Sequence, residues 1–313
     1  MRALPLCVVI GGWLSMPAFA ADADTWMASL AKAGQSHSYA GTFVYGRDGS
    51  FSSHAVWHQV KGGEVRERLL QLDGPAVEVV RINGQVQCSS DEFASAAEPS
   101  QAWQNPRFDA KALSEWYEFR VIGESRIADR PAVAIAVLAR DQHRYSFELH
   151  LDRETAFPIK SLMLSEKGQL LERLQFTHFE AGNVPVPGLK ATAACKPVEH
   201  VERTEPSSGW RADWLPPGFK LLESAQRPGV DADVPVTWLS YGDGLARFSV
   251  FIEPLRGAQV HDARSQMGPT VVVSKRISGS GGDVMVTVVG EVPLGTAERV
   301  ALSARSEGEA AGQ

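Results

Sequence analysis

Apolar and polar residues alternate with a period of two over much of the chain behind residue 38, which is typical of half-buried β-strands. The clearest example is 145–152, where large apolar residues alternate with acidic residues and a histidine. This pattern predicts a strand with one dry face and one wet face. Turn residues separate the alternating runs, and Asn83-Gly84 is the strongest signal for a tight hairpin. In the front half, strands are predicted at 39–45, 53–60, 65–72, 76–82, 117–124, 133–138, 145–152, 158–165 and 170–179.

A helical period is confined to a few segments. Apolar residues from Trp26 to Ala33 recur at helical spacing and predict a helix over 24–37, with Asp24 or Thr25 as its cap. Shorter helices, which interrupt or end the run of strands, are predicted at 92–97, 109–116 and 297–305.

Between residues 181 and 209 prolines and glycines accumulate and no period is present, which indicates a connection between domains. Behind it, a second set of strands is predicted at 219–225, 236–241, 247–253, 270–277 and 284–291, and Thr296 is the expected cap of the last helix. The fold class is therefore mainly β (α+β), and the length favours two domains. The expected division is a signal peptide at 1–20, a front domain at 21–182, a linker at 183–209, a back domain at 210–305 and a disordered tail at 306–313.

The first twenty residues have the features of a cleaved export signal. Arg2 precedes an apolar stretch that is too short to span a bilayer, and Ala18-Phe19-Ala20 gives the small-x-small pattern of a cleavage site. An uncleaved anchor is the alternative. Removing this segment leaves 30 basic and 37 acidic groups, a net charge of −7, which argues against a nucleic-acid partner.

Two cysteines remain after that cleavage, Cys88 and Cys195. An oxidising compartment favours a disulfide between them, and two buried free thiols are the alternative. A bond that closes so long a loop would stabilise the fold by roughly 4–5 kcal/mol in the chain-entropy model.

Catalytic and metal-binding motifs are missing from the sequence. His54 and His58 share a predicted strand, where residues four apart are roughly 13 Å from each other, too far to ligate one ion. The chain contains neither a His-Glu-x-x-His nor a Cys-x-x-Cys pattern, and Ser280 lies in a glycine-rich hairpin rather than a nucleophile elbow. We therefore expect no catalytic residue, no metal and no cofactor.

The remaining candidates are large apolar side chains on predicted strands. In the front half they form either an ordinary core or the lining of an incompletely filled sheet that holds an acyl chain. The candidates for lipid binding are Phe43, Trp57, Phe147, Leu149 and Leu151. The candidates for partner binding in the back half are Trp238, Tyr241, Phe248 and Phe251.

Several long blocks in both halves resemble the MucB/RseB family, and they look closest to its branch found with alginate regulation. The blocks that carry the resemblance are 39–45, 53–58, 67–74, 141–145, 149–161, 214–219, 241–254 and 288–293. The segment 181–209 matches least well. The family comprises periplasmic negative regulators of sigma-E type sigma factors.

The resemblance implies a front domain similar to the lipoprotein carrier fold, an unclosed antiparallel β-barrel with plug helices, and a smaller back sheet with a helix. It implies a periplasmic protein that binds the periplasmic part of a membrane anti-sigma factor of the MucA/RseA type. Binding would hide that segment from the site-1 protease, and a lipid or lipopolysaccharide fragment would release it. A homodimer is compatible with the sequence, and a periplasmic carrier of lipoproteins or lipids is the main alternative function.

Overall fold

The computed structural model describes residues 22–74, 77–90, 109–182, 184–198, 209–229, 235–255, 260–279 and 282–306. The predicted signal peptide, the predicted helix at 92–97 and the predicted tail lie outside these ranges apart from Ser306. Among the described helices, none combines the length and the apolar character needed to cross a bilayer.

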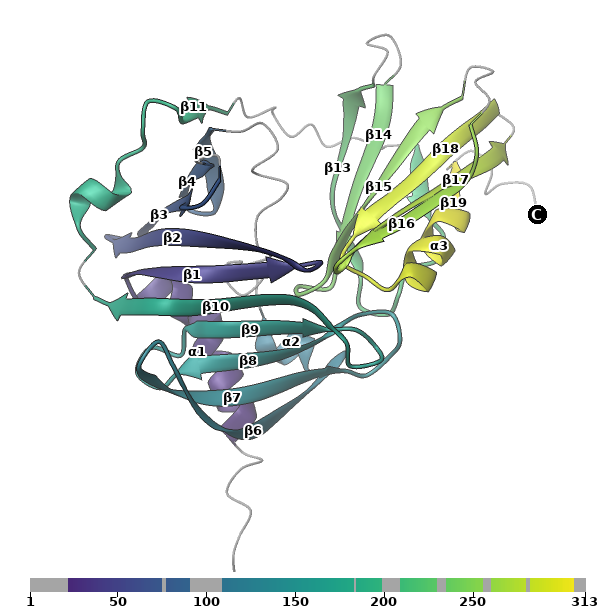
Figure 1. Cartoon of the computed structure of the whole chain (residues 1–313). Coiled ribbons are helices and arrows are strands. Elements are labelled where there is room, and N and C mark those ends of the chain that lie inside the picture. The colour runs from purple at the N-terminus through teal and green to yellow at the C-terminus, as the bar shows by residue number, and fades with distance from the viewer. Residues whose placement is uncertain are drawn as a thin grey trace, which may run out of the picture.

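The first sheet has eleven antiparallel strands in the order β11-β5-β4-β3-β2-β1-β10-β9-β8-β7-β6 (Figure 1). The strands are β1 (Tyr39–Arg47), β2 (Ser50–Lys61), β3 (Glu64–Gln71), β4 (Glu78–Ile82), β5 (Gln85–Ser89), β6 (Tyr117–Ile127), β7 (Arg130–Ala139), β8 (Ser146–Asp152), β9 (Pro158–Leu164), β10 (Leu170–Ala181) and β11 (Lys196–Pro197). The end strands β6 and β11 do not pair with each other, so the predicted unclosed antiparallel barrel is confirmed. Asn83 and Gly84 both have positive φ, as a type I′ hairpin turn requires.

Two helices, α1 (Asp22–Ser36) and α2 (Ala110–Leu113), pack on one face of this sheet. Because α1 already begins at Asp22, the prediction that Asp24 or Thr25 caps it is wrong. The predicted helix at 109–116 is shorter than expected, since the chain turns after Leu113 to enter β6. The side chain of Asp109 caps α2 by accepting hydrogen bonds from the N–H groups of Lys111 and Ala112.

The second sheet has six strands in the order β13-β14-β15-β18-β17-β16. They are β13 (Lys220–Pro228), β14 (Pro235–Gly242), β15 (Arg247–Pro254), β16 (Ala263–Met267), β17 (Thr270–Gly279) and β18 (Gly282–Gly290). A further pair, β12 (Trp210–Ala212) and β19 (Ala304–Ser306), lies at the two ends of this domain. The smaller antiparallel sheet is thus confirmed, while β12, β16 and β19 were not predicted.

Helix α3 (Leu294–Leu302) covers one face of the second sheet. It begins three residues earlier than predicted because Pro293, with extended backbone, is its N-cap. Thr296 therefore lies inside the helix rather than at its cap, and its hydroxyl contacts Nδ1 of His143 at 3.2 Å. The end of the predicted helix, from Ala304, is strand β19.

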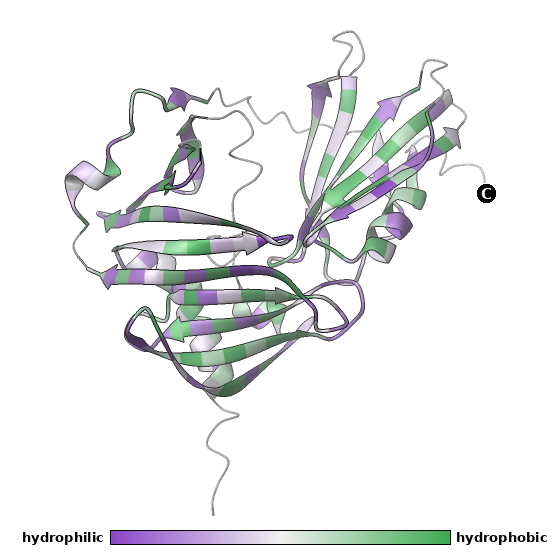
Figure 2. Ribbon diagram, viewed as in Figure 1, coloured by the Kyte–Doolittle hydropathy of each residue, from purple (hydrophilic) through white to green (hydrophobic). Residues whose placement is uncertain are grey.

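Two of the three polar residues on the predicted wet face of β8 are buried instead, and the third, Glu148, is half-buried. Asp152 is only 1% exposed, and His150 is buried beside it. The reason is that neighbouring strands supply long partners: Arg130 donates from Nε to Oδ1 of Asp152 over 2.6 Å, and Lys160 lies 3.1 Å from His150. Figure 2 shows that hydrophilic and hydrophobic residues alternate along these strands. Such alternation, taken alone, predicts that one face of the strand is exposed to solvent.

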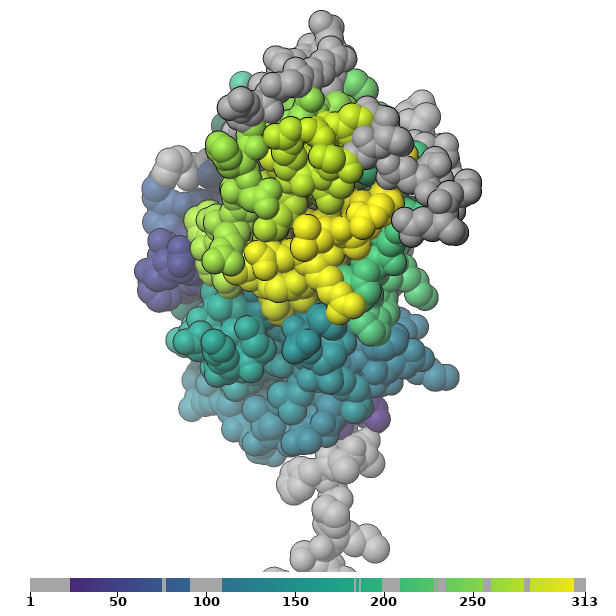
Figure 3. Space-filling view, turned by 90° about the vertical axis from the view of Figure 1, so that its right-hand side faces the viewer, coloured from purple at the N-terminus to yellow at the C-terminus, as the bar shows by residue number. Residues whose placement is uncertain are grey.

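The two domains touch at the lower end of the second sheet. Figure 3 shows the yellow-green residues of the second sheet and α3 lying directly on the teal residues of the first sheet. Leu245 of the β14–β15 turn belongs to the same buried cluster as Tyr117 and Phe147 of the front domain. Arg47, at the tip of the β1–β2 hairpin, donates hydrogen bonds to the Met267 carbonyl and the Thr270 hydroxyl.

Candidate partner-binding surface

The second sheet has one covered face and one open face, because successive side chains of a strand point to opposite sides. Residues that face α3, such as Val250, Val273 and Val288, are buried in the back-domain core. The alternate positions carry aromatic, aliphatic and hydroxyl side chains, together with charged ones such as Arg276 and Asp283, which pair with each other. In Figure 1 this open face is turned away from α3 and toward the side on which β2–β5 lie.

Trp238 and Phe251 form the centre of the open face. They are direct cross-strand partners on β14 and β15, and both are partly exposed. The guanidinium of Arg227 lies 4.1 Å from the centre of the Trp238 ring, so it stacks on the indole. The same row continues with Thr287 and Ser274, whose hydroxyls are 2.9 Å apart. We call Trp238, Phe251, Thr287 and Ser274 the open-face row.

The other two predicted partner-binding residues, Tyr241 and Phe248, lie on the covered face. Their rings stack at 5.4 Å within the back-domain core, and both are buried. The Tyr241 hydroxyl contacts the backbone N–H of Ala212 at 3.3 Å, which ties β12 to the sheet. The structure therefore separates the four candidates into two pairs, and it places only Trp238 and Phe251 where another polypeptide can reach them.

Four of the five predicted lipid-binding residues are buried in the front domain. Phe147, Leu149 and Leu151 form one cluster with apolar residues of α1 and α2. Phe43 stacks on the His54 ring at 5.1 Å and belongs to a second buried cluster, which also contains Tyr39 and Phe176. In this conformation, side chains of the protein itself occupy the space beside these residues.

The fifth, Trp57, is covered by a segment from the predicted linker. That segment forms the 3-10 turn η2 (Val186–Leu189), and a Cβ on Gly188 would lie 2.4 Å from the indole ring. Only glycine permits this contact without displacement of the ring. The ring also lies 4.8 Å from the guanidinium of Arg68, which donates a hydrogen bond to the Gly188 carbonyl.

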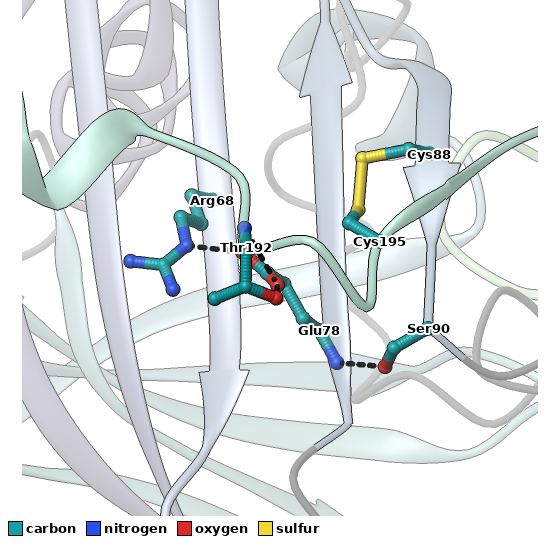
Figure 4. The surroundings of a disulfide bond; sticks show 6 residues. All are labelled: Arg68, Glu78, Cys88, Ser90, Thr192 and Cys195. Carbon is teal, nitrogen blue, oxygen red and sulfur yellow. Dashed lines mark hydrogen bonds and ion pairs between the residues drawn. A yellow bond between two sulfur atoms is a disulfide. The ribbon is translucent and has the colours of Figure 1, made fainter.

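The predicted disulfide between Cys88 and Cys195 is present, and it fastens the same segment to the edge of the first sheet (Figure 4). Next to it, β11 pairs with β5. Residues 184–198 are thus packed on the front domain, although sequence placed them in a linker.

Beside the disulfide lies a buried charge, Glu78, which is 1% exposed (Figure 4). Its carboxylate accepts a hydrogen bond from Nε of Arg68 at 2.5 Å and further bonds from the N–H and hydroxyl of Thr192. Burial opposes ionisation of Glu78, but these donors outweigh it and hold the pKa of the carboxyl below its ordinary value.

The polar clusters of the described residues are ion pairs and hydrogen-bonded networks. Within these residues, no three or more His, Cys, Asp or Glu side chains gather in a way that could hold a metal ion. His58 is buried and lies 3.1 Å from Glu67, while its other nitrogen lies 2.7 Å from the Gly34 carbonyl. His54 contacts Ser52.

Comparison with known proteins identifies relatives of both domains. A family model described as the MucB/RseB N-terminal domain matches residues 22–201, and one described as the MucB/RseB C-terminal domain matches residues 204–305. The chain is 56% identical to the sigma factor AlgU regulatory protein MucB of Pseudomonas aeruginosa, over 99% of each chain.

Two solved structures of MucB are also similar to this chain in their three-dimensional fold. A structure of the Pseudomonas aeruginosa MucA/MucB complex is 57% identical, with a TM-score of 0.81 over 91% of this chain and 99% of that chain. A crystal structure of MucB is 56% identical, with a TM-score of 0.71 over 92% of this chain and 98% of that one.

Proposed function

Since the chain belongs to the MucB/RseB family, we propose that it represses an envelope-stress sigma factor by binding the periplasmic part of a membrane anti-sigma factor. The observation that carries this proposal is the likeness to MucB in its complex with MucA, at 57% identity and a TM-score of 0.81. The signal peptide predicted at residues 1–20 and the disulfide both support a periplasmic location.

The open-face row is the surface that we assign to the partner. A few side chains, often aromatic, supply most of the binding energy in protein interfaces. We assign this part to the Trp238–Phe251 pair, whose two residues are cross-strand neighbours. The neighbouring hydroxyls of Ser274 and Thr287 can exchange hydrogen bonds with the backbone of an extended segment. This chemistry fits an unfolded stretch of polypeptide with apolar side chains.

Repression then follows from competition for one segment. A polypeptide held against the sheet cannot simultaneously lie extended in the cleft of the site-1 protease. The bound fraction of the anti-sigma factor is therefore protected, and the sigma factor stays sequestered. No bond is made or broken by this chain, so it acts as a binding protein rather than an enzyme.

Release requires a ligand that prefers the unbound conformation, because a ligand shifts an equilibrium only by its differential affinity. We assign this role to a lipid or lipopolysaccharide fragment that binds the front domain. Phe147, Leu149 and Leu151 are packed against α1 and α2, so an acyl chain reaches them only if those helices move. Lipid binding would thereby be coupled to a rearrangement of the front domain.

Calorimetric titration of the protein with the periplasmic segment of its anti-sigma factor tests the proposal. We expect saturable binding that Trp238→Ala and Phe251→Ala each weaken by about tenfold or more. Leu302→Ala is the matched control, since Leu302 is 54% exposed on α3 and lies on the opposite side of the sheet. Absence of binding by the unaltered protein would overturn the proposed function.

Protection is measured separately, by adding the site-1 protease to the segment with and without the protein. We expect slower cleavage in its presence and recovery of the rate when lipopolysaccharide is added. Equal cleavage rates in the presence of a bound complex would overturn the shielding mechanism and leave the binding function intact.

A further inference from the structure

A buried ion pair joins the two domains. Arg144, in the β7–β8 connection, has no exposed side-chain surface, and neither has Asp243 in the β14–β15 turn. The guanidinium Nη1 donates to Oδ2 of Asp243 at 2.6 Å, and Nη2 donates to the carbonyl of Pro217 at 2.6 Å. Both partners belong to the back domain, whereas Arg144 belongs to the front domain.

All parts of this pair are engaged in directional contacts. Arg144 also donates from Nε and Nη2 to the carboxylate of Asp141, at 3.1 and 2.9 Å. The second oxygen of Asp243 accepts the N–H groups of Leu245 and Ala246, which fixes the turn that presents it. Tyr117 adds a hydroxyl donor 3.2 Å from Oδ2 of Asp243.

Aromatic rings enclose the guanidinium and keep water away from it. Its carbon lies 5.5 Å from the centres of the Trp116 and Tyr117 rings and 5.3 Å from that of Phe219. Trp116 fills the space above Gly218, where a Cβ would lie 2.4 Å from the indole. The ion pair is thus shielded on both the front-domain and the back-domain side.

Such a pair tolerates little displacement. Apolar surfaces can slide past one another, but separating two buried charges without rehydrating them leaves each uncompensated. The domains therefore have one favoured orientation with the pair formed, and other orientations become accessible only when water reaches both groups. A buried hydrogen bond from the Tyr145 hydroxyl to the Val292 carbonyl, 3.0 Å long, reinforces that orientation.

We propose that Arg144 and Asp243 are positioning residues that hold the open face in the orientation to which the anti-sigma segment binds most tightly. The inference rests on the proposed function, which it deepens. The structure of this chain as a whole is more similar to MucB in the MucA complex, with a TM-score of 0.81, than to the other MucB structure, with a TM-score of 0.71.

Asp243→Asn tests the proposal in the full-length mature protein, because it removes the charge and keeps an oxygen for the Leu245 and Ala246 amides. Small-angle X-ray scattering reports the domain orientation, and calorimetric titration reports the affinity for the anti-sigma segment. We expect a larger radius of gyration and at least about tenfold weaker binding. Asp129→Asn is the matched control, since its carboxylate is 86% exposed and pairs with Arg126 on the front-domain surface.

Unchanged scattering, or altered scattering with an affinity within about twofold of the unaltered protein, would overturn the proposal. The scattering measurement is independent of the proposed function, because it is made on the protein without its partner. If Asp243→Asn fails to fold, Arg144→Lys takes its place, since it keeps the charge but loses the forked geometry of the guanidinium. Small-angle scattering and calorimetric titration of Arg144→Lys are then interpreted by the same criteria.

Discussion

Glu78 and Thr192, which are 114 residues apart in sequence, are joined by hydrogen bonds from the backbone N–H of Thr192 to both carboxylate oxygens, at 3.1 and 3.2 Å. Because Arg68 binds the same carboxylate, one buried charge connects β3 and β4 to the segment that precedes Cys195. The disulfide and this carboxylate are therefore two separate attachments of that segment to the front domain.

Replacing Glu78 with Gln should destabilise the front domain strongly. The substitution leaves the Arg68 guanidinium buried without a counter-charge, which costs about 3–5 kcal/mol in comparable buried pairs. Urea unfolding followed by circular dichroism measures the change in the free energy of unfolding. Glu64→Gln is the control, because its pair with Arg66 is exposed and should contribute less than about 1 kcal/mol. Equal effects of the two substitutions would contradict this account of the buried pair.

Loss of the Cys88–Cys195 bond should lower the free energy of unfolding by roughly 4–5 kcal/mol, since the bond closes a loop of more than one hundred residues. Reduction of the unaltered protein and the double substitution Cys88→Ser/Cys195→Ser should give similar losses. The mass of the unreduced mature protein should be two hydrogens below that of the reduced form. Free thiols at both positions in freshly purified protein would remove the basis of this prediction.

The stability of the front domain should fall in mild acid because of His54. Burial lowers the pKa of His54, with partial opposition from Asp73, so the folded protein binds this proton less readily than the unfolded chain does. The stabilisation is therefore present above the unfolded-state pKa of about 6.5 and decreases as the pH falls below it, until the folded-state pKa is passed.

His54→Phe removes this titration and keeps a ring to stack on Phe43. Between about pH 7.5 and pH 5.5, the free energy of unfolding of the variant should depend less on pH than that of the unaltered protein. Both slopes come from urea titrations at a series of pH values. Identical slopes would show that other groups account for the acid sensitivity.

Truncation of Trp238 and truncation of Phe248 should have different effects on stability and on binding, although both residues were predicted from the sequence to bind the partner. Phe248→Ala removes a ring from the back-domain core and should cost about 3–5 kcal/mol of folding free energy. Trp238→Ala, on the open face, should cost much less stability but weaken binding of the anti-sigma segment. Thermal melts and binding titrations on both variants distinguish the two roles, and a reversed pattern would contradict the assignment of the faces.

The period of two along the predicted strands could have refined the choice of partner-binding candidates. Trp238 and Tyr241 are three residues apart on one strand, as are Phe248 and Phe251, so the members of each pair must point to opposite faces. Within each strand this rule separates the two candidates, and the β14–β15 register, which pairs Trp238 with Phe251, then combines them into the two sets that the structure shows. The choice of which set faces α3 required the tertiary structure.

Other elements could not be predicted from periodicity. Strand β16, with the sequence Ala-Arg-Ser-Gln-Met, is exposed at all five positions, so no apolar face marks it. The burial of Arg144 and Asp243 depends on two segments that are 99 residues apart in the sequence and meet only in the tertiary structure. In isolation, charged residues beside turns indicate solvent-exposed loops.

The fastening of residues 184–198 to the first sheet also limits how far the two domains can separate. Val198 is the last described residue on the front domain, and Gly209 is the first described residue behind it, eleven peptide steps further along the chain. A fully extended chain spans at most about 3.6 Å per residue, so Gly209 stays within roughly 40 Å of Val198 even if every contact between the domains is lost. Confinement to this volume gives each domain an effective concentration in the millimolar range around the other. Reassociation is therefore intramolecular, and its rate does not depend on how many copies of the protein a cell contains.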